Sequence, residues 1–324
     1  MSYKVMIPSY IVEEGVNLLK DAGLEVVTLF DEPKEKVLEQ LSDYDAILTR
    51  LTKITLYSDT LEGKTDGLKV VGVHGAGVDN IDVDKATELG IAVISTPEAN
   101  AEAVAEHTIG LIIALTKHIV KTDKVTRAGG YEDRDQFVGV NLEGKKLGIV
   151  GPGGIGSRVG TKMAKAFDME VLTYHPGEPS HTVPSEMTLT NNWEGFIKEC
   201  DVISLHCPLI PQTEGMVGKE EFRMMKDDAY LINVARGPII DEKALIEALD
   251  QGELAGAALD VYEEEPPADD NPLFEMDNVV VTPHTAWLTK ETRIKMAVDS
   301  AQGIIDVLNG DQPEYIVNPE VFEG

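Results

Sequence analysis

The sequence predicts an α/β protein built from two doubly wound domains, each with a parallel sheet between layers of helices. Short apolar runs alternate with apolar residues at helical spacing along both halves of the chain, and this alternation is typical of parallel sheets covered by helices on both faces. A chain of 324 residues is also long enough to form two domains of ordinary size. We therefore expect two sheets rather than one.

Composition and charge narrow the classes of function. Hydrophobic residues make up 43% and charged residues 26% of the chain, as in globular proteins. The formal net charge of −29 disfavours nucleic acids and anionic membrane surfaces as partners, because both bind basic faces. Cys200 and Cys207 provide neither a disulfide framework nor a metal-ligand spacing, so we expect no metal site and a reducing compartment. With no signal-peptide core and no run of membrane-spanning length, we expect a cytoplasmic protein.

The first part of the chain alternates between expected strands and expected helices. We expect strands at 4–7, 25–30, 45–49, 68–73 and 92–95, and helices at 12–22, 34–41 and 83–89. One long helix is then expected over 100–127, with a stop at Gly129 and Gly130. Because it is longer than most helices of globular proteins, we expect it to link domains or to join a subunit interface.

The second part of the chain shows the same alternation. We expect strands at 147–150, 171–174, 201–205, 229–234, 255–261 and 279–282, with helices such as 242–249 between them. A final amphipathic helix is expected over 290–309. Since both halves are rich in strand–helix–strand units, we expect two similar domains.

The segment from Lys146 to His175 combines strand, glycine-rich turn, helix and strand in the pattern of a βαβ unit. Its turn fits the spacing G-x-G-x-x-G at Gly151, Gly153 and Gly156. These glycines are expected to make the tight turn, to let the backbone approach a pyrophosphate, and to let helix and strand pack closely. The alternative is a glycine-rich loop without a ligand, but the strand–helix context favours a dinucleotide.

The second strand of this unit lacks one part of the dinucleotide fingerprint. An acidic residue is expected at its end to hold the adenosine ribose, and the chain instead has Tyr174, His175 and Pro176. The sequence therefore predicts that a dinucleotide binds but leaves open which one.

Four other expected strands are followed by residues that are able to do chemistry. They are the glycine loop 75–77, Arg236, Glu265 and His284. Each has a simple structural alternative. The loop 75–77 could be only a turn, and Arg236 could form only a surface ion pair. Glu265 could be a solvated acid, and His284 a structural histidine. Together beside a dinucleotide site they provide a carboxylate-binding cation, an orienting carboxylate and a proton donor, which hydride transfer to a 2-oxo acid requires.

Over nearly its whole length the chain resembles the D-isomer-specific 2-hydroxyacid dehydrogenases. The segments that carry the resemblance are GAGVDNID (75–82), NAEAVAEHTIG (100–110), VGPGGIG (150–156), HCPLIPQT (206–213), INVARG (232–237), ALDVYEEEP (258–266) and TPHTAW (282–287). The resemblance implies two Rossmann-like domains, with an NAD-binding domain at 99–288 inserted into a flavodoxin-like substrate domain formed by 1–98 and 289–324. It also implies a homodimer through the cofactor domain.

The resemblance also implies the site residues. The catalytic residues would be Arg236, Glu265 and His284. The substrate would contact Gly75, Ala76, Gly77 and Leu51. The cofactor would contact Thr108, Gly151, Gly153, Gly154, Ile155, Gly156, His175, His206, Cys207, Pro208, Thr213, Val234, Ala235 and Asp260, the last beside the nicotinamide carboxamide.

The expected reaction is reversible hydride transfer between NADH and a small 2-oxo acid. Arg236 and the N–H groups of 75–77 would bind the substrate carboxylate, and His284 would donate a proton to the developing alkoxide. Glu265 would pair with His284 and favour its charged form.

Pyruvate is the favoured substrate. Leu51 stands where phosphoglycerate-using relatives carry a second Arg, and the aromatic end of TPHTAW resembles lactate-forming relatives. Phosphoglycerate, phosphoerythronate, glyoxylate and hydroxypyruvate stay open. A remoter alternative is a cofactor-sensing corepressor, although the chain adds no partner-binding tail.

NAD is the expected cofactor, with reduced discrimination against NADP. His175 stands where NAD-selecting members usually have Asp, and we expect Glu178, three residues further on, to reach the ribose instead. No Lys or Arg occurs between Lys165 and Lys198, so this loop offers no cation for a 2′-phosphate. NADP therefore stays an alternative.

Overall fold

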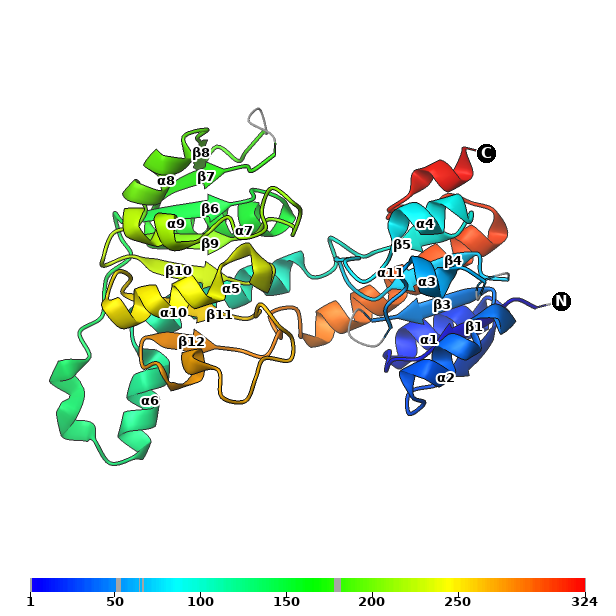
Figure 1. The fold of residues 1–324 in the computed structure, drawn as a ribbon, viewed down its shortest axis with the longest axis horizontal. Coiled ribbons are helices and arrows are strands. Elements are labelled where there is room, and N and C mark those ends of the chain that lie inside the picture. The colour runs from blue at the N-terminus through cyan, green and yellow to red at the C-terminus, as the bar shows by residue number, and fades with distance from the viewer. Residues whose placement is uncertain (1, 51–53, 64, 66, 178–181, 324) are drawn as a thin grey trace. The chain divides into compact units, whose positions relative to one another are not determined.

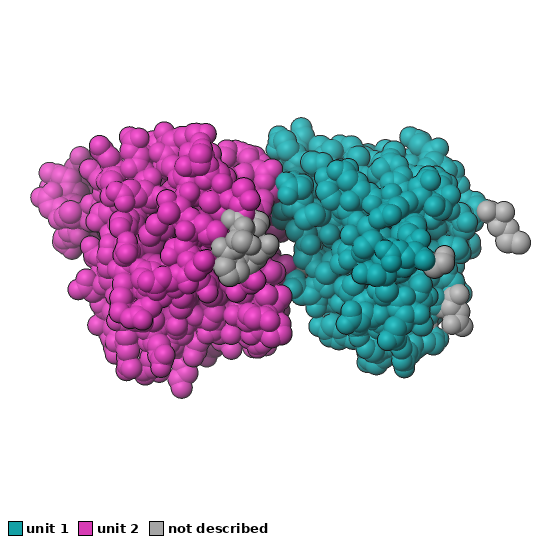
Figure 2. All heavy atoms as spheres, turned by 90° about the horizontal axis from the view of Figure 1, so that it is seen from above, with its two compact units in different colours: residues 1–100, 288–324 teal, residues 101–287 magenta. Residues whose placement is uncertain are grey.

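The computed structural model describes residues 2–50, 54–63, 65, 67–177 and 182–323. The chain divides into two compact units, residues 1–100 with 288–324 (unit 1) and residues 101–287 (unit 2), which Figure 2 colours separately. Each unit contains one sheet whose described strand pairs are all parallel. The prediction of an α/β fold with two parallel sheets is confirmed.

The sheet of unit 1 has the strand order β2-β1-β3-β4-β5 (Figure 1). The strands are β1 (Lys4–Ile7), β2 (Glu25–Thr28), β3 (Ala46–Thr49), β4 (Val70–Val73) and β5 (Ala92–Ile94). This order is the flavodoxin-like one, in which the strand order reverses between the first and third strands. Ligands of such sheets bind beyond the carboxyl ends of the strands near that reversal.

Helices cover both faces of the unit 1 sheet. They are α1 (Glu13–Asp21), α2 (Lys34–Glu39), α3 (Ser58–Leu61), α4 (Val83–Glu88) and α11 (Lys290–Asn309), with 3-10 turns at Leu41–Asp43 and Pro319–Phe322. Alternate residues of β1 face opposite ways: Val5 and Ile7 pack with α1 and α11, whereas Met6 packs with α2 and α4. This alternation is the period of a strand whose two faces are both buried.

The sheet of unit 2 has the order β12-β11-β10-β9-β6-β7-β8. The strands are β6 (Lys146–Val150), β7 (Glu170–Tyr174), β8 (Met187–Leu189), β9 (Val202–Leu205), β10 (Tyr230–Asn233), β11 (Gly256–Leu259) and β12 (Val279–Val281). Counted within the unit, the first three strands run outward one way and the later strands the other, as in dinucleotide-binding sheets. The reversal falls between β6 and β9.

Two hydrophobic clusters fill the two faces of this sheet. The helices are α5 (Ala101–Thr116), α6 (Ile119–Arg127), α7 (Gly154–Phe167), α8 (Trp193–Glu199), α9 (Lys219–Met224) and α10 (Glu242–Gln251), with 3-10 turns at Tyr131–Gln136, Gly237–Ile239 and Pro272–Glu275. Ile149 of β6 lies in the cluster shared with α5 and α7, and Val150 lies in the cluster shared with α8, α9 and α10. β6 is therefore buried on both sides and places the turn that follows it.

The single long helix expected over 100–127 is wrong. α5 ends at Thr116, and α6 leaves it at an angle of 60°. His118 between them has a φ of 54°, in the left-handed region, and the Thr116 carbonyl accepts a hydrogen bond from the N–H of Val140 at 2.9 Å. This contact with a segment beyond α6 takes a carbonyl that a continuing helix would use.

No single helix in the described part of the chain is long and apolar enough to cross a membrane. α5 and α6 pass such a test only as a bent pair, by length and composition. Most of α5 is buried in the core of unit 2.

Candidate functional site

The glycine turn after β6 has the geometry that a bound dinucleotide requires. Gly151 has a φ of 89°, and a Cβ placed on it would lie 2.8 Å from the carbonyl oxygen of His206. A Cβ on Gly156 would lie 2.3 Å from the carbonyl oxygen of Gly151. A Cβ on Gly153 would meet nothing within 4 Å. The first and third glycines are thus needed for chain packing, whereas the second borders open space at the start of α7, where a pyrophosphate would fit.

The loop after β9 lies against this turn. The N–H of His206 donates to the carbonyl of Val150 at 2.7 Å, which continues the pairing of β9 with β6. Further along, Thr213 is fully buried, and its hydroxyl donates to the carbonyl of Pro208 at 2.6 Å and accepts from the N–H of Ile210 at 2.9 Å. The observed contacts of Thr213 hold the loop, so its expected contact with a cofactor stays a prediction.

Two other residues expected to contact the cofactor have identified partners. Thr108 is fully buried on α5, and its hydroxyl donates to the carbonyl of Val104 at 2.7 Å. His175 follows β7, and its Nδ1 accepts a hydrogen bond from the N–H of Gly177 at 3.1 Å. Glu178 lies outside the described residues, so its expected reach toward the ribose stays a prediction.

Arg236 is placed by the end of β10. Asn233, the last residue of that strand and almost fully buried, accepts from the N–H of Ala235 at 3.0 Å and donates to the carbonyl of Arg236 at 2.9 Å. The guanidinium of Arg236 donates to the carbonyl of Ala235 at 2.8 Å. Asn233 therefore shapes the turn that presents Arg236.

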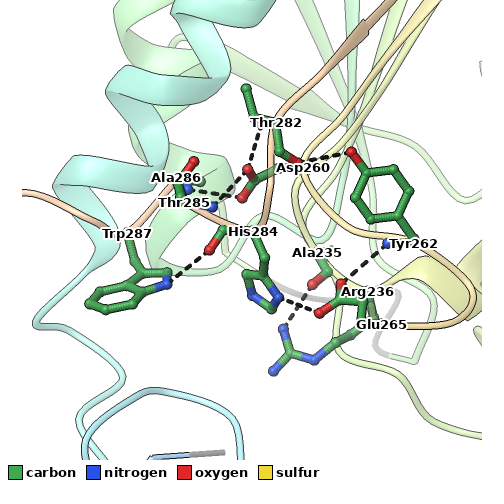
Figure 3. Close-up of polar contacts among 10 residues, drawn as sticks. All are labelled: Ala235, Arg236, Asp260, Tyr262, Glu265, Thr282, His284, Thr285, Ala286 and Trp287. Atoms are coloured by element: carbon green, nitrogen blue, oxygen red, sulfur yellow. Dashed lines mark hydrogen bonds and ion pairs between the residues drawn. The ribbon is translucent and has the colours of Figure 1, made fainter. Parts of the chain in front are cut away.

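His284 and Glu265 form a direct pair. Nδ1 of His284 lies 2.7 Å from Oε2 of Glu265, whose Oε1 accepts from the N–H of Tyr262 at 3.2 Å. Figure 3 shows the guanidinium of Arg236 on the same side as the imidazole and the carboxylate. These three residues, each at least 19 positions from the next along the chain, are thus brought together beyond the ends of β10, β11 and β12. With both side chains about one-third exposed, the His284–Glu265 pair is open to solvent.

Opposing effects set the charge of Glu265. Burial raises the pKa of the Glu265 carboxyl, but the hydrogen bond and charge of His284, the N–H of Tyr262 and the charge of Arg236 outweigh burial, and the net pKa lies below its ordinary value of 4.5. Glu265 is therefore ionised throughout the neutral range and is able to stabilise an imidazolium.

The backbone of His284 is unusual and is held by Asp260. His284 has a φ of 51°, a left-handed conformation that few residues other than glycine adopt, and its N–H donates to the Asp260 carbonyl at 2.8 Å. The fully buried Asp260 carboxylate accepts from the N–H groups of Thr285 and Ala286, both at 2.9 Å, and from the hydroxyl of Thr282 at 2.5 Å (Figure 3). Asp260 thus fixes the segment that carries His284, and its expected contact with the nicotinamide carboxamide stays a prediction.

Sequence reasoning missed the residues that support the site. Tyr262 donates through its hydroxyl to the carbonyl of Thr282 at 3.0 Å, and burial, followed by nearby carboxylates, raises the pKa of Tyr262 to about 12, so it keeps this proton. Asn233 and Thr282 lie within the segments that carry the resemblance, and this was their only signal in the sequence. Asn233 acts through local hydrogen bonds, whereas the role of Thr282 depends on which strands are neighbours.

The glycine loop expected to bind the substrate belongs to unit 1. It follows β4, and the carbonyl of Gly75 accepts from the N–H of Thr96 at 2.8 Å. His74 directly before it is buried, and burial lowers its pKa to about 4. Leu51 lies outside the described residues.

Comparison with known proteins assigns the family. Residues 109–286 match the model of the D-isomer-specific 2-hydroxyacid dehydrogenase NAD binding domain. A glyoxylate reductase of Thermofilum pendens is 39% identical over 99% of this chain and 96% of its own length. The chain belongs to the D-isomer-specific 2-hydroxyacid dehydrogenase family. Family members are named as dehydrogenases and reductases, and the match assigns an NAD binding domain to unit 2.

Other family members differ in length and in named substrate. A D-3-phosphoglycerate dehydrogenase of Methanocaldococcus jannaschii is 41% identical over 97% of this chain, which spans only 59% of that relative's length. A solved structure from Thermus thermophilus has a TM-score of 0.89 and 32% identity, covering 97% of this chain and 99% of its own. A D-lactate dehydrogenase of Aquifex aeolicus, complexed with NAD and lactic acid, has a TM-score of 0.81 and 28% identity, with coverages of 95% and 96%.

Proposed function

We propose that the protein catalyses reversible, stereospecific transfer of hydride between NADH and a small 2-oxo acid. The observation that carries the proposal is the His284–Glu265 pair at 2.7 Å beside Arg236, at the carboxyl ends of strands in the NAD binding unit. The proposal is supported by the position of these three side chains, because ligands of such sheets bind at the carboxyl ends of the strands.

Each polar group has a distinct task in the proposed reaction. Arg236 binds the substrate carboxylate and polarises the ketone, because a guanidinium presents several donors in one plane. Bound NADH supplies the hydride that the carbonyl carbon receives. His284 in its protonated form donates a proton to the alkoxide oxygen, and Glu265 stabilises the imidazolium before transfer. Binding of a substrate carboxylate by the N–H groups of Gly75–Gly77, expected from the sequence, is a separate proposal.

The proposed substrate is pyruvate, with D-lactate as its product. The support is the aromatic Trp287 at the end of the His284 segment and the likeness to the D-lactate dehydrogenase of known structure. The names of other relatives keep phosphoglycerate and glyoxylate as alternatives. Phosphoerythronate and hydroxypyruvate stay alternatives that the sequence left open.

For the cofactor, we propose NAD with weak discrimination against NADP. His175 supplies no negative charge to repel a 2′-phosphate, so the selectivity that an acid would give is reduced. Comparing kcat/KM for NADH and NADPH tests this. A strong preference for NADPH would show that His175 or a cation elsewhere recognises the phosphate.

A second class of function is a cofactor-sensing binding protein. Following NADH oxidation with pyruvate, glyoxylate, hydroxypyruvate, phosphohydroxypyruvate and the oxidised form of phosphoerythronate separates the two classes and ranks the substrates. We expect turnover, fastest with pyruvate. NADH binding without turnover of any 2-oxo acid would favour the sensor.

We also propose a homodimer formed through unit 2. The segment 119–138, which contains α6 and the 3-10 turn after it, exposes Ile119, Val120, Tyr131 and Val138, an apolar set that a partner copy would cover. Light scattering of the purified chain measures the mass directly, and a monomer at all concentrations would contradict the proposal. The cytoplasmic location expected from the sequence stays a prediction.

A further inference from the structure

His107 has no part in the proposed chemistry, yet it contacts the network that holds the catalytic segment. It lies on α5, with its side chain about one-quarter exposed. Its Nε2 lies 3.2 Å from the hydroxyl oxygen of Thr282 and 3.8 Å from Oδ1 of Asp260. Both partners lie more than 150 positions away along the chain, so this contact joins separate parts of unit 2.

The chemistry of the three groups sets the direction of their hydrogen bonds. The Asp260 carboxylate accepts two backbone N–H groups, and a carboxylate has no proton to donate. The Thr282 hydroxyl has one proton, and it lies 2.5 Å from Oδ1 of Asp260. Thr282 must therefore accept from His107, whose Nε2 carries a proton. The resulting order is His107 to Thr282 to Asp260.

The far end of this chain of hydrogen bonds is the backbone around His284. Asp260 holds the N–H groups of the two residues that follow His284, and its own carbonyl holds the N–H of His284. A left-handed backbone at a residue other than glycine, such as His284, is strained and persists only where surrounding contacts impose it. Loosening the Asp260 carboxylate would therefore release the segment that places the imidazole.

His107 also joins the two segments by which the chain enters and leaves unit 2. The chain enters at Ala101, the first residue of α5, and leaves after Trp287, five residues beyond Thr282. A hydrogen bond between His107 and Thr282 ties these segments together next to the site. The position of His284 is thereby fixed from both segments.

We infer that His107 is a positioning residue that holds His284 in its proton-donating position through Thr282 and Asp260. The inference rests on the proposed function for its kinetic part. Its structural part concerns the proton on Nε2 of His107 and the effect on the environment of His284. This part can be tested whether or not the protein turns over a substrate.

Three variants test the kinetic part. His107→Leu removes the donor and is expected to lower kcat for 2-oxo acid reduction about 10-fold or more, because small misplacements of a catalytic group are costly. KM for NADH should change less than about 2-fold, and the isotope effect with deuterated NADH should rise as chemistry becomes slower. His107→Gln, which keeps an N–H donor, should recover most of the loss. Glu106→Ala, on the exposed neighbouring position of α5, should leave kcat unchanged.

Double substitution tests the route through Thr282. Thr282→Val removes the hydroxyl while keeping the shape of the side chain, and His107→Leu should then add little further loss, because the two residues act through one hydrogen bond. Fully additive losses, or equal losses with Leu and Gln at position 107, would overturn the inference.

Nuclear magnetic resonance provides the test that needs no activity. Nitrogen-labelled histidine should show His107 with its proton on Nε2, and the His284 resonances should move in His107→Leu and Thr282→Val but not in Glu106→Ala. A proton on Nδ1 alone in His107, or unmoved His284 resonances, would overturn the inference even if every 2-oxo acid proved inactive. Lack of turnover by the unsubstituted protein would instead count against the proposed function.

Discussion

The pairing of His284 with Glu265 determines how the proposed reaction depends on pH. The pKa of Glu265 lies below 4.5, so this carboxylate keeps its charge as the pH rises from 5 to 9 and contributes no change of its own. Reduction consumes the proton of His284, so reduction should weaken as the pH rises and oxidation should strengthen. A flat profile for reduction, with chemistry shown to be rate-limiting, would contradict this assignment.

Removing the imidazole gives the first prediction. His284→Ala should lower kcat for reduction at least about 100-fold, the effect typical of losing a general acid. The variant should still bind NADH, because His284 belongs to the proton-transfer step. Rapid mixing at saturating substrate measures the rate, and turnover close to that of the unsubstituted protein would disprove the role.

Removing the charge partner gives the second prediction. Glu265→Gln keeps the shape of the side chain but leaves the imidazolium without its ion pair. The fall of the reduction rate with rising pH should therefore begin at lower pH than in the unsubstituted protein. Identical profiles of log kcat against pH for both proteins would show that Glu265 does not control the charge of His284.

At the scale of elements, the β6–α7 turn combines packing and ligand approach in three glycines. Strand, turn and helix were all predictable here, because the apolar run, the glycine spacing and the helical period are local patterns. The break between α5 and α6 was not predictable. It depends on the Thr116 carbonyl meeting the N–H of Val140, a partner far beyond the helix.

Two alanine substitutions in the turn should separate its two roles. Gly156→Ala would place a Cβ 2.3 Å from the Gly151 carbonyl oxygen, so the free energy of unfolding should fall by about 1–3 kcal/mol. A Cβ on Gly153 would meet nothing within 4 Å, so Gly153→Ala should leave the free energy of unfolding unchanged. Its affinity for NADH should fall, because the methyl group would stand where the pyrophosphate approaches the backbone. Calorimetry and NADH titration measure the two effects. Unchanged NADH affinity in Gly153→Ala would show that the pyrophosphate does not bind at this turn.

Across the whole molecule, two histidines, His74 in unit 1 and His206 in unit 2, have a pKa that loss of solvent contact holds well below its ordinary value. Burial lowers the pKa of His74 in unit 1 to about 4 and that of His206 in unit 2 to about 3, both from 6.5. Because the unfolded chain takes up these protons first, stability is lost as the pH falls below 6.5.

Each of these histidines should contribute a slope of about 1.4 kcal/mol per pH unit between pH 6 and pH 5. Unfolding by denaturant at several pH values measures the slope, with His206→Gln as the variant that should flatten it for unit 2. A free energy of unfolding that is constant over this range would contradict the lowered pKa of both imidazoles.

The sequence predicted the two sheets and the grouping of Arg236, Glu265 and His284 because motif order determines which strand ends meet. It did not predict the supporting network of Tyr262, Thr282 and His107, because hydrogen bonds between distant segments follow from tertiary packing. Leu51, which was expected to contact the substrate, lies outside the described residues. The choice among 2-oxo acids is therefore decided by experiment.

The most direct test of the central claim is the chirality of the product formed from 2-oxo acids and NADH. The purified protein is incubated with NADH and pyruvate, and in parallel with the larger 2-oxo acids, and the hydroxy acids are separated by chiral chromatography. We predict accumulation of the D-isomer, in amounts equal to the NADH consumed. Formation of the L-isomer, or NADH consumption without a 2-hydroxy acid, would contradict the proposed reaction.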